Sequence, residues 1–176
     1  MPHILVIYTT LRGRTGEMVA PICAGIQGEG MEARQRAVEA VTWEEMQAAD
    51  GIVVGNPTRF GGVDWQIKRL FDVVAIQGYP GPLAGKVGGA FTAGGRPGSG
   101  AELALLATLH ILLNHGMVIQ GNAFSAHYGP VYLRETPEAA MQEECRTWGR
   151  LWAQLVKRLA PGAQAGSRYV DTEAQA

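Results

Sequence analysis

The chain is poor in the residues that build disulfide frameworks and metal sites. Only two of its 176 residues are cysteine, so neither a disulfide network nor a cysteine-rich metal site is expected. Cys23 and Cys145 each fall within a helical pattern, and we predict that both are reduced thiols in the core. Reduced thiols favour a cytoplasmic location, and no metal is predicted.

The chain also lacks an excess of charge and any long apolar run. Its 15 Lys and Arg residues nearly balance its 16 Asp and Glu residues, so no basic surface favours nucleic acid, and we expect none as a partner. No apolar run approaches the roughly 20 residues of a membrane span, so no membrane insertion is expected. Aromatic residues make up only 7% of the chain, which leaves the walls of any pocket largely to backbone and small side chains.

Glycine, in contrast, is abundant, with 24 residues, and many of them follow short apolar runs. These runs are typical of buried strands, and each is followed by apolar residues at helical spacing. The predicted strands cover residues 4–8, 31–38, 51–55, 87–92 and 117–120. The predicted helices start near Thr15, Thr42, Asp64, Ala101 and Thr136.

Five strands that alternate with five helices predict a doubly wound α/β fold with a parallel sheet. Two strand orders compete for such a chain. The order 2-1-3-4-5 places a ligand crevice beyond the carboxyl ends of strands one and three. We expect a single domain over residues 1–160 and a disordered tail over residues 161–176, which are mostly small and polar.

Three loops that follow predicted strands carry the candidate functional residues. The first, residues 9–15, combines hydroxyls, two arginines and a glycine just before a helix whose first amides lack internal partners, which suits a phosphate. The second, residues 56–62, combines a rigid turn, an arginine and an exposed aromatic ring. The third, residues 93–100, has so little side chain that its amides could approach a flat ligand. Read individually, the first loop has the alternative of an ordinary capped surface loop, and the third has that of a flexible connection.

Gly55-Asn56-Pro57-Thr58-Arg59-Phe60-Gly61, together with residues 8–15 and 115–118, resembles the flavodoxin-like NAD(P)H:quinone oxidoreductases of the WrbA family. This resemblance implies a flavodoxin-like three-layer sandwich with a five-stranded parallel sheet, FMN as the cofactor and NAD(P)H as the electron donor. It implies that the FMN phosphate is held by residues 10–15 and that the flavin ring lies between the second and third loops. The implied cofactor residues are Thr10, Leu11, Arg12, Gly13, Arg14, Thr15, Pro57, Thr58, Arg59, Phe60, Gly61, Thr92, Ala93, Gly94, Gly95, Arg96 and Gly98.

The resemblance also implies residues for the substrate side and for catalysis. Arg12 falls where the family places a tyrosine near the nicotinamide cofactor, and Phe60 and Tyr79 would wall the substrate face. The family carries His-His-Gly-Met before its fifth strand, where this chain has Asn114 and His115. We take both as candidate catalytic residues, although a polar end to the preceding helix would explain them equally well.

The function implied by this resemblance is the transfer of two electrons from NAD(P)H to a quinone-type acceptor by a ping-pong mechanism. Two alternatives stay open, namely a flavodoxin-type electron carrier and a flavin-binding module without its own turnover. Segments that help to build the family tetramer are missing here, so both a homodimer and a homotetramer are compatible with the sequence. A phospho-receiver is disfavoured, since Thr9, Thr10 and Asn56 stand where its metal-binding acids would be.

Overall fold

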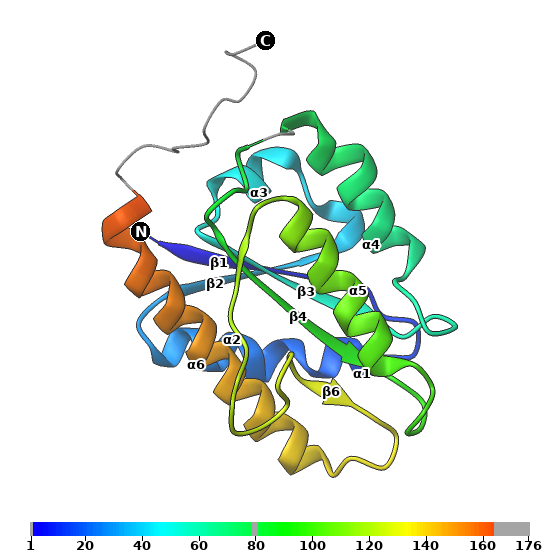
Figure 1. The fold of residues 1–176 in the computed structure, drawn as a ribbon. Coiled ribbons are helices and arrows are strands. Elements are labelled where there is room, and N and C mark those ends of the chain that lie inside the picture. Colours follow the sequence, from blue (N-terminus) through cyan, green and yellow to red (C-terminus); the bar gives the residue numbers. More distant parts are fainter. Residues whose placement is uncertain (1, 79–80, 164–176) are drawn as a thin grey trace.

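The structure is a computed structural model that describes residues 2–78 and 81–163, with side chains up to residue 159. Its centre is a parallel sheet in the order β2-β1-β3-β4-β5, with a sixth strand, β6, also paired to β4. The strands are β1 (His3–Tyr8), β2 (Glu32–Ala37), β3 (Gly51–Pro57), β4 (Val87–Ala93), β5 (Val118–Ile119) and β6 (Val131–Tyr132). The predicted order 2-1-3-4-5 and the predicted fold class are confirmed (Figure 1).

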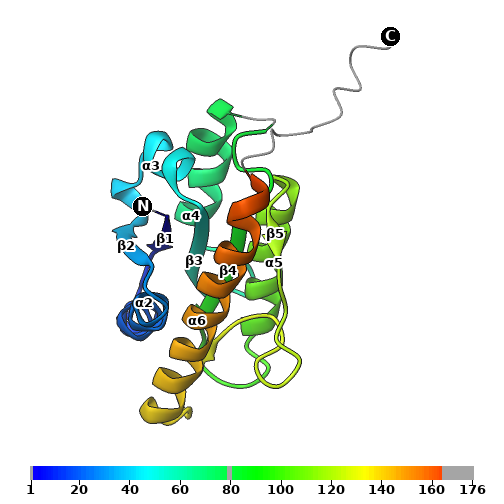
Figure 2. The same ribbon diagram turned by 90° about the vertical axis from the view of Figure 1, so that its left-hand side faces the viewer.

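Helices cover both faces of the sheet (Figures 1 and 2). One face packs against α2 (Val19–Gly28) and α6 (Glu138–Ala163). The other packs against α3 (Trp43–Ala48), α4 (Trp65–Arg69) and α5 (Ala101–Asn114). The remaining helical segments are α1 (Arg14–Glu17), the 3₁₀ turns η1 (Val38–Ala40) and η3 (Ala75–Gly78), and the π turn η2 (Leu70–Val74).

The continuous apolar run of β1 follows from this two-sided cover. Successive side chains of a strand point to opposite faces, so Ile4 and Val6 join the core under α2 and α6. Leu5 and Ile7 join the core on the other face. All four are almost fully buried, as the run of apolar residues predicted.

The helices α2 and α6 approach each other at two glycines. A Cβ atom on Gly149 of α6 would lie 2.3 Å from the Ile22 carbonyl oxygen, and one on Gly25 of α2 would lie 2.2 Å from the Arg146 carbonyl oxygen. This contact brings the stripe of apolar side chains on α6 against the sheet, where Trp152 packs over the space left by Gly89. The prediction that this stripe forms core is confirmed, with Trp148 and Trp152 both about 1% exposed.

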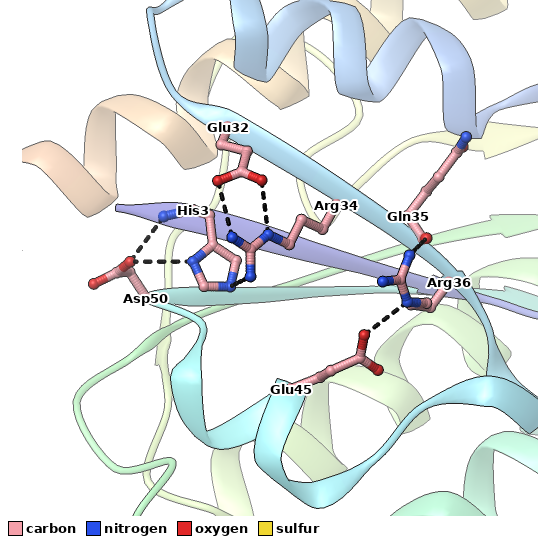
Figure 3. A network of polar contacts seen from close by, with 7 residues as sticks. All are labelled: His3, Glu32, Arg34, Gln35, Arg36, Glu45 and Asp50. Carbon is pink, nitrogen blue, oxygen red and sulfur yellow. Dashed lines mark hydrogen bonds and ion pairs between the residues drawn. The ribbon is translucent and has the colours of Figure 1, made fainter. Parts of the chain in front are cut away.

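The strand β2 forms an exposed edge of the sheet, and charged side chains cover it (Figure 3). The Arg34 guanidinium pairs with the Glu32 carboxylate at 2.7 Å and reaches the buried ring of His3 at 3.5 Å. The His3 amide donates to the Asp50 carboxylate at 2.8 Å. Exposed ion pairs of this kind contribute little stability, but charged side chains along an edge disfavour pairing with a further strand.

Two predicted helices differ in detail from the observed ones. The helix expected from Thr15 is interrupted at Met18, because Pro21 has no N–H to donate to the carbonyl of residue 17. The helix expected near Asp64 does begin there, with the Asp64 side chain capping the Gln66 amide, but it continues as η2 and η3. The capping box of Thr42 and Glu45 is present as predicted.

The fifth strand is shorter than predicted, and a separate strand pairs with the rest of that edge of β4. The structure gives Val118–Ile119 in place of residues 117–120, and β6 then pairs with the far end of β4 within the predicted loop. The helix α6 also runs past Pro161 to Ala163, beyond the expected start of the tail. The rest of the predicted disordered tail lies outside the described residues, as does Tyr79.

The glycine contact between α2 and α6 leads to a stability prediction. Replacing Gly149 with alanine forces the two helices apart, since the added methyl group would meet backbone atoms that cannot move independently. We expect a loss of about 1–3 kcal/mol in the free energy of unfolding. Gly28→Ala in α2 is the matched control, because nothing lies within 4 Å of its Cβ position. Equal stability of the Gly149→Ala and Gly28→Ala variants in urea unfolding would contradict the packing described.

The two thiols lead to a prediction of alkaline instability. Both cysteines are unpaired, and burial raises the pKa of Cys23 to about 11 and that of Cys145 to about 12, from an ordinary value of 9.0. Above about pH 9 the unfolded chain loses thiol protons that the folded chain keeps, so the free energy of unfolding should fall as the pH rises. Urea unfolding at about pH 8 and about pH 10 should show a smaller fall for Cys145→Ser than for the original chain. Identical falls would contradict the buried, protonated state of Cys145.

Candidate functional site

Three loops meet at the carboxyl edge of the sheet because the strands before them are parallel and paired in register. The loop after β1 covers residues 9–13, the loop after β3 residues 58–62 and the loop after β4 residues 94–100. β3 and β4 pair along their whole length, and the Thr58 amide then donates to the Ala93 carbonyl at 2.9 Å. The Thr9 amide is likewise bonded to the Gly55 carbonyl at 3.1 Å. The three sequence-predicted loops therefore lie side by side.

These loops enclose a cavity of about 320 Å³. The first loop and α1 supply one wall, the ends of β3 and β4 supply the floor, and one arginine comes from the segment after β6. The residues that line it are Thr10, Leu11, Arg12, Arg14, Thr15, Pro57, Thr58, Ala93, Gly94, Gly95 and Arg134.

The first loop offers hydrogen-bond donors to this cavity. No backbone amide from Thr10 to Thr15 donates to another residue in the described parts of the chain. Gly13 has a φ of +88°, a conformation that favours glycine and turns the chain into α1. Thr15 is 1% exposed yet lines the cavity. Unpaired amides, a hydroxyl and nearby guanidiniums together suit an anionic group.

Arg14 joins the first loop to the third. Its guanidinium donates to the Gly94 carbonyl at 3.1 Å and lies 5.8 Å from the ring centre of Tyr132. A guanidinium over an aromatic face is attracted by the negative face of the ring. Arg14 therefore lines the cavity and also links the first loop to the third across it.

The second loop is held in a strained, open shape. Arg59 and Gly62 exchange two backbone hydrogen bonds of 3.2 and 2.9 Å, and the Arg59 guanidinium pairs with the buried Asp64 carboxylate at 3.0 Å. Phe60 at the tip is fully exposed and has a φ of +49°, which is uncommon for a residue with a side chain. Strain of this kind is found mostly at ligand sites, where the surroundings enforce it.

The second and third loops touch through glycine. A Cβ atom on Gly100 would lie 2.6 Å from the Gly61 Cα atom, and Gly100 itself has a φ of +86°. No other residue type would allow the two backbones to come so close in this conformation. The spacing of the two loops on either side of the cavity therefore depends on this pair.

Most of the predicted cofactor residues are brought together here. Ten of them line the cavity directly: Thr10, Leu11, Arg12, Arg14, Thr15, Pro57, Thr58, Ala93, Gly94 and Gly95. Gly13, Arg59, Phe60, Gly61, Arg96 and Gly98 lie on the same three loops. Thr92 is fully buried below them, where its hydroxyl donates to the Asn56 carbonyl at 2.6 Å and cross-links β3 and β4.

The two candidate catalytic residues lie elsewhere in the chain. Asn114 ends α5 and His115 follows it, at the far end of a helix of 14 residues that spans about 21 Å from its start beside the third loop. The Asn114 amide donates to the His110 carbonyl at 2.8 Å, and the His115 ring packs 5.4 Å from the ring of Phe71. Burial lowers the pKa of His115. Within one chain neither side chain reaches the cavity, and their catalytic role stays a prediction.

Arg134 and Tyr132 are site residues that sequence reasoning did not identify. Both depend on β6, which pairs Ala93 with Tyr132 and is followed by a bond from the Arg134 amide to the Gly95 carbonyl at 3.2 Å. The only signal in the sequence is a short apolar run, Val131-Tyr132-Leu133, directly after Pro130. Because β6 has only two residues, it shows no periodic pattern from which a strand could be predicted.

Among residues 2–78 and 81–163, no three His, Cys, Asp or Glu side chains gather so that they could hold a metal ion. In the same part of the chain, every helix is too short or too polar to cross a lipid bilayer.

Solved structures identify the fold of the chain. A flavodoxin, WrbA-like protein from Agrobacterium tumefaciens superposes with a TM-score of 0.77 at 22% identity, over 90% of this chain and 99% of that one. A flavodoxin from the domain Archaea gives a TM-score of 0.73 at 22% identity, over 88% and 99% of the two chains. The chain therefore has the flavodoxin-like fold.

Sequence comparisons identify the family. The family model for NADPH-dependent FMN reductase matches residues 16–130. A protein named flavodoxin from Aquifex aeolicus is 36% identical over 169 residues, 92% of this chain and 91% of the relative. A protein named NAD(P)H dehydrogenase (quinone) from Archaeoglobus fulgidus is 31% identical over 146 residues, 69% and 76% of the two chains. The chain belongs to the NADPH-dependent FMN reductase family. Its cofactor is FMN and its electron donor is NAD(P)H. The predicted resemblance to the flavodoxin-like quinone oxidoreductases is confirmed.

The glycine contact at the site leads to a prediction about cofactor affinity. Gly100→Ala should push the second and third loops apart and raise the dissociation constant of FMN by about tenfold, the cost of one overpacked contact. Fluorescence titration of the apoprotein with FMN measures this constant. Gly62→Ala is the control on the same pair of loops, because its Cβ would meet only the Arg59 carbonyl oxygen at an ordinary 3.6 Å. Unchanged affinity in Gly100→Ala would show that the loop spacing does not matter for FMN.

Proposed function

We propose that the protein is an FMN-dependent oxidoreductase that transfers two electrons from NAD(P)H to a quinone-type acceptor by a ping-pong mechanism. The observation that carries this proposal is the cavity of about 320 Å³ at the carboxyl edge of the sheet, which joins a donor-rich loop to two loops that present mainly backbone. An anion site next to a backbone-lined opening suits a cofactor that has a phosphate at one end and a flat ring at the other. The relatives named NAD(P)H dehydrogenase (quinone) support the choice of acceptor.

In this proposal the first loop holds the phosphate of FMN. The unpaired amides of residues 10–15 donate to the phosphate oxygens, with the Thr10 and Thr15 hydroxyls beside them. Leu11, Arg12, Gly13 and Arg14 complete this wall. Because Arg14 is also bonded to Gly94, its guanidinium fixes the distance between the phosphate end and the third loop.

The second and third loops border the ring. On one side lie Pro57, Thr58, Arg59, Phe60 and Gly61, and on the other lie Thr92, Ala93, Gly94, Gly95, Arg96 and Gly98. The Arg59 side chain is already paired with Asp64, so this residue contributes its backbone rather than its guanidinium. Thr92 is buried, so it contributes indirectly, through its bond to Asn56 at the base of the two loops.

When bound, FMN would supply the redox chemistry, namely hydride transfer from the nicotinamide and two-electron reduction of the acceptor. The protein needs no nucleophile for this reaction, only groups that bind and orient the partners. Phe60 is an exposed aromatic side chain at the tip of the second loop, and we propose that it packs against the nicotinamide and the quinone in turn. Arg12, at the rim, could meet the phosphates of the dinucleotide. Since donor and acceptor share one face, the first product must leave before the acceptor enters.

An electron carrier is the second candidate, favoured by one observation. The relative from Aquifex aeolicus named flavodoxin is 36% identical and covers 92% of this chain. A carrier docks onto partner proteins through a strongly charged surface, whereas this chain has a net charge of only −1. The charge balance therefore supports the enzyme over the carrier.

The cytoplasmic location and the homodimer or homotetramer remain proposals. Leu103 and Leu113 on α5, and Trp65, Val73 and Ile76 along α4 and its continuation, are large exposed apolar side chains on helical segments that cover the same face of the sheet. A second copy of the chain would cover such side chains if the protein is a homo-oligomer.

The proposed reaction has a direct spectroscopic test. The FMN-loaded protein should lose its visible flavin absorption on anaerobic addition of NADH or NADPH and regain it on addition of a benzoquinone. Bands that do not respond to either nucleotide would contradict the enzyme and favour the carrier.

The ping-pong order is tested separately by steady-state kinetics. Double-reciprocal plots at several quinone concentrations should be parallel, because donor and acceptor use one face in turn. Intersecting lines would mean that both bind together and would contradict a single shared site.

A further inference from the structure

The arginines around the cavity differ in whether their guanidinium groups already have a hydrogen-bond or ion-pair partner in the folded chain. The Arg14 guanidinium is bonded to the Gly94 carbonyl, and that of Arg59 is paired with Asp64. Arg134, like Arg12 on the first loop, lines the cavity, is exposed, and has no ion pair or side-chain hydrogen bond within the described parts of the chain. Its positive charge therefore lies beside a donor-rich cavity without a negative partner among those residues.

The backbone of Arg134 is nevertheless held firmly in place. Its amide donates to the Gly95 carbonyl at 3.2 Å. The Leu133 amide donates to the Thr136 hydroxyl at 3.1 Å, and the Thr136 amide donates back to the Leu133 carbonyl at 3.1 Å. A long cationic side chain on a fixed backbone is well suited to bind a ligand, because only the side chain must be ordered.

Arg134 also approaches the cavity from the side opposite to the first loop. In the sheet order, β1 and β6 lie on either side of the β3 and β4 pair. The amides of residues 10–15 follow β1, whereas Arg134 follows β6, and both line the same cavity. An anion in that cavity would be bound by backbone donors on one side and by a guanidinium on the other.

We propose that Arg134 is a specificity residue that makes the site select the phosphorylated flavin, FMN, over riboflavin. Its guanidinium donates charge-assisted hydrogen bonds to the phosphate, which riboflavin lacks. This inference rests on the proposed placement of the FMN phosphate in the first loop, and it adds a residue that the family resemblance does not supply.

The test compares two ligands that differ only in the phosphate. Dissociation constants of FMN and riboflavin are measured by flavin fluorescence with the apoprotein, for the original chain and for Arg134→Gln. We expect Arg134→Gln to weaken FMN binding by about tenfold, the loss of one partly exposed charge-assisted bond, and to leave riboflavin binding unchanged. Arg134→Lys should fall between the two, since it keeps the charge but loses the forked geometry.

Arg69→Gln is the matched control, because it removes the same charge from an exposed residue of α4 that lines a different cavity. This control should leave the affinities for both flavins unchanged. The difference in FMN affinity between Arg134→Gln and the original chain should also shrink at high salt, where the charge is screened.

Several outcomes would overturn the inference. Equal weakening of FMN and riboflavin in Arg134→Gln would mean that Arg134 only supports the loop. Unchanged FMN affinity would exclude a contact with the phosphate. A raised KM for NADPH, but not for NADH, with unchanged FMN affinity would assign the guanidinium to the dinucleotide instead. If the original chain binds neither flavin, the proposed function itself fails, which these measurements distinguish from failure of the Arg134 assignment alone.

Discussion

The functional site depends on the pairing of β3 with β4 over all seven residues of each strand. This register ends both strands at the same level of the sheet, so the second and third loops leave it side by side. Buried bonds then hold that edge together, from the Thr92 hydroxyl to the Asn56 carbonyl and from the Asp64 amide to the Asn56 side chain. These bonds beneath the loop help it to hold a fully exposed Phe60 in a strained conformation.

The divided fifth strand is the second determinant of the site. If β5 had continued along β4, the segment from Gly121 to Pro130 would not leave the sheet at this point. Instead β5 pairs with Val87 and Gly88 only, and β6 takes the place beside Thr92 and Ala93. The return of the chain brings Tyr132 under the Arg14 guanidinium and Arg134 to the rim of the cavity. A change in strand length at the edge of the sheet thus alters the charge and shape of the site.

Backbones approach each other closely both in the core and at the site, and the two contacts serve different purposes. At Gly25 and Gly149 the close approach lets two long helices pack tightly over the tryptophans, which serves stability. At Gly61 and Gly100 it narrows the space between two loops, which serves binding. In both places the lack of a side chain is what the geometry requires, and most other glycines in the described part of the chain show no such contact with a backbone.

Apolar periodicity in the amino-acid sequence determined the α/β fold class, the two-sided burial of β1 and the three loops, because these are local signals. Periodicity left two strand orders open, and the flavodoxin-like order followed from the resemblance carried by the Pro57–Gly61 motif. Ten predicted cofactor residues line one cavity, since parallel strands carry their loops to the same edge whatever the details. Only the tertiary structure decided that Thr92 faces inward, that Arg59 is paired with Asp64, and that Asn114 and His115 lie at the far end of α5. It also decided the place of Arg134. These facts depend on which residues meet across the sheet, and such long-range contacts leave no periodic trace in the sequence.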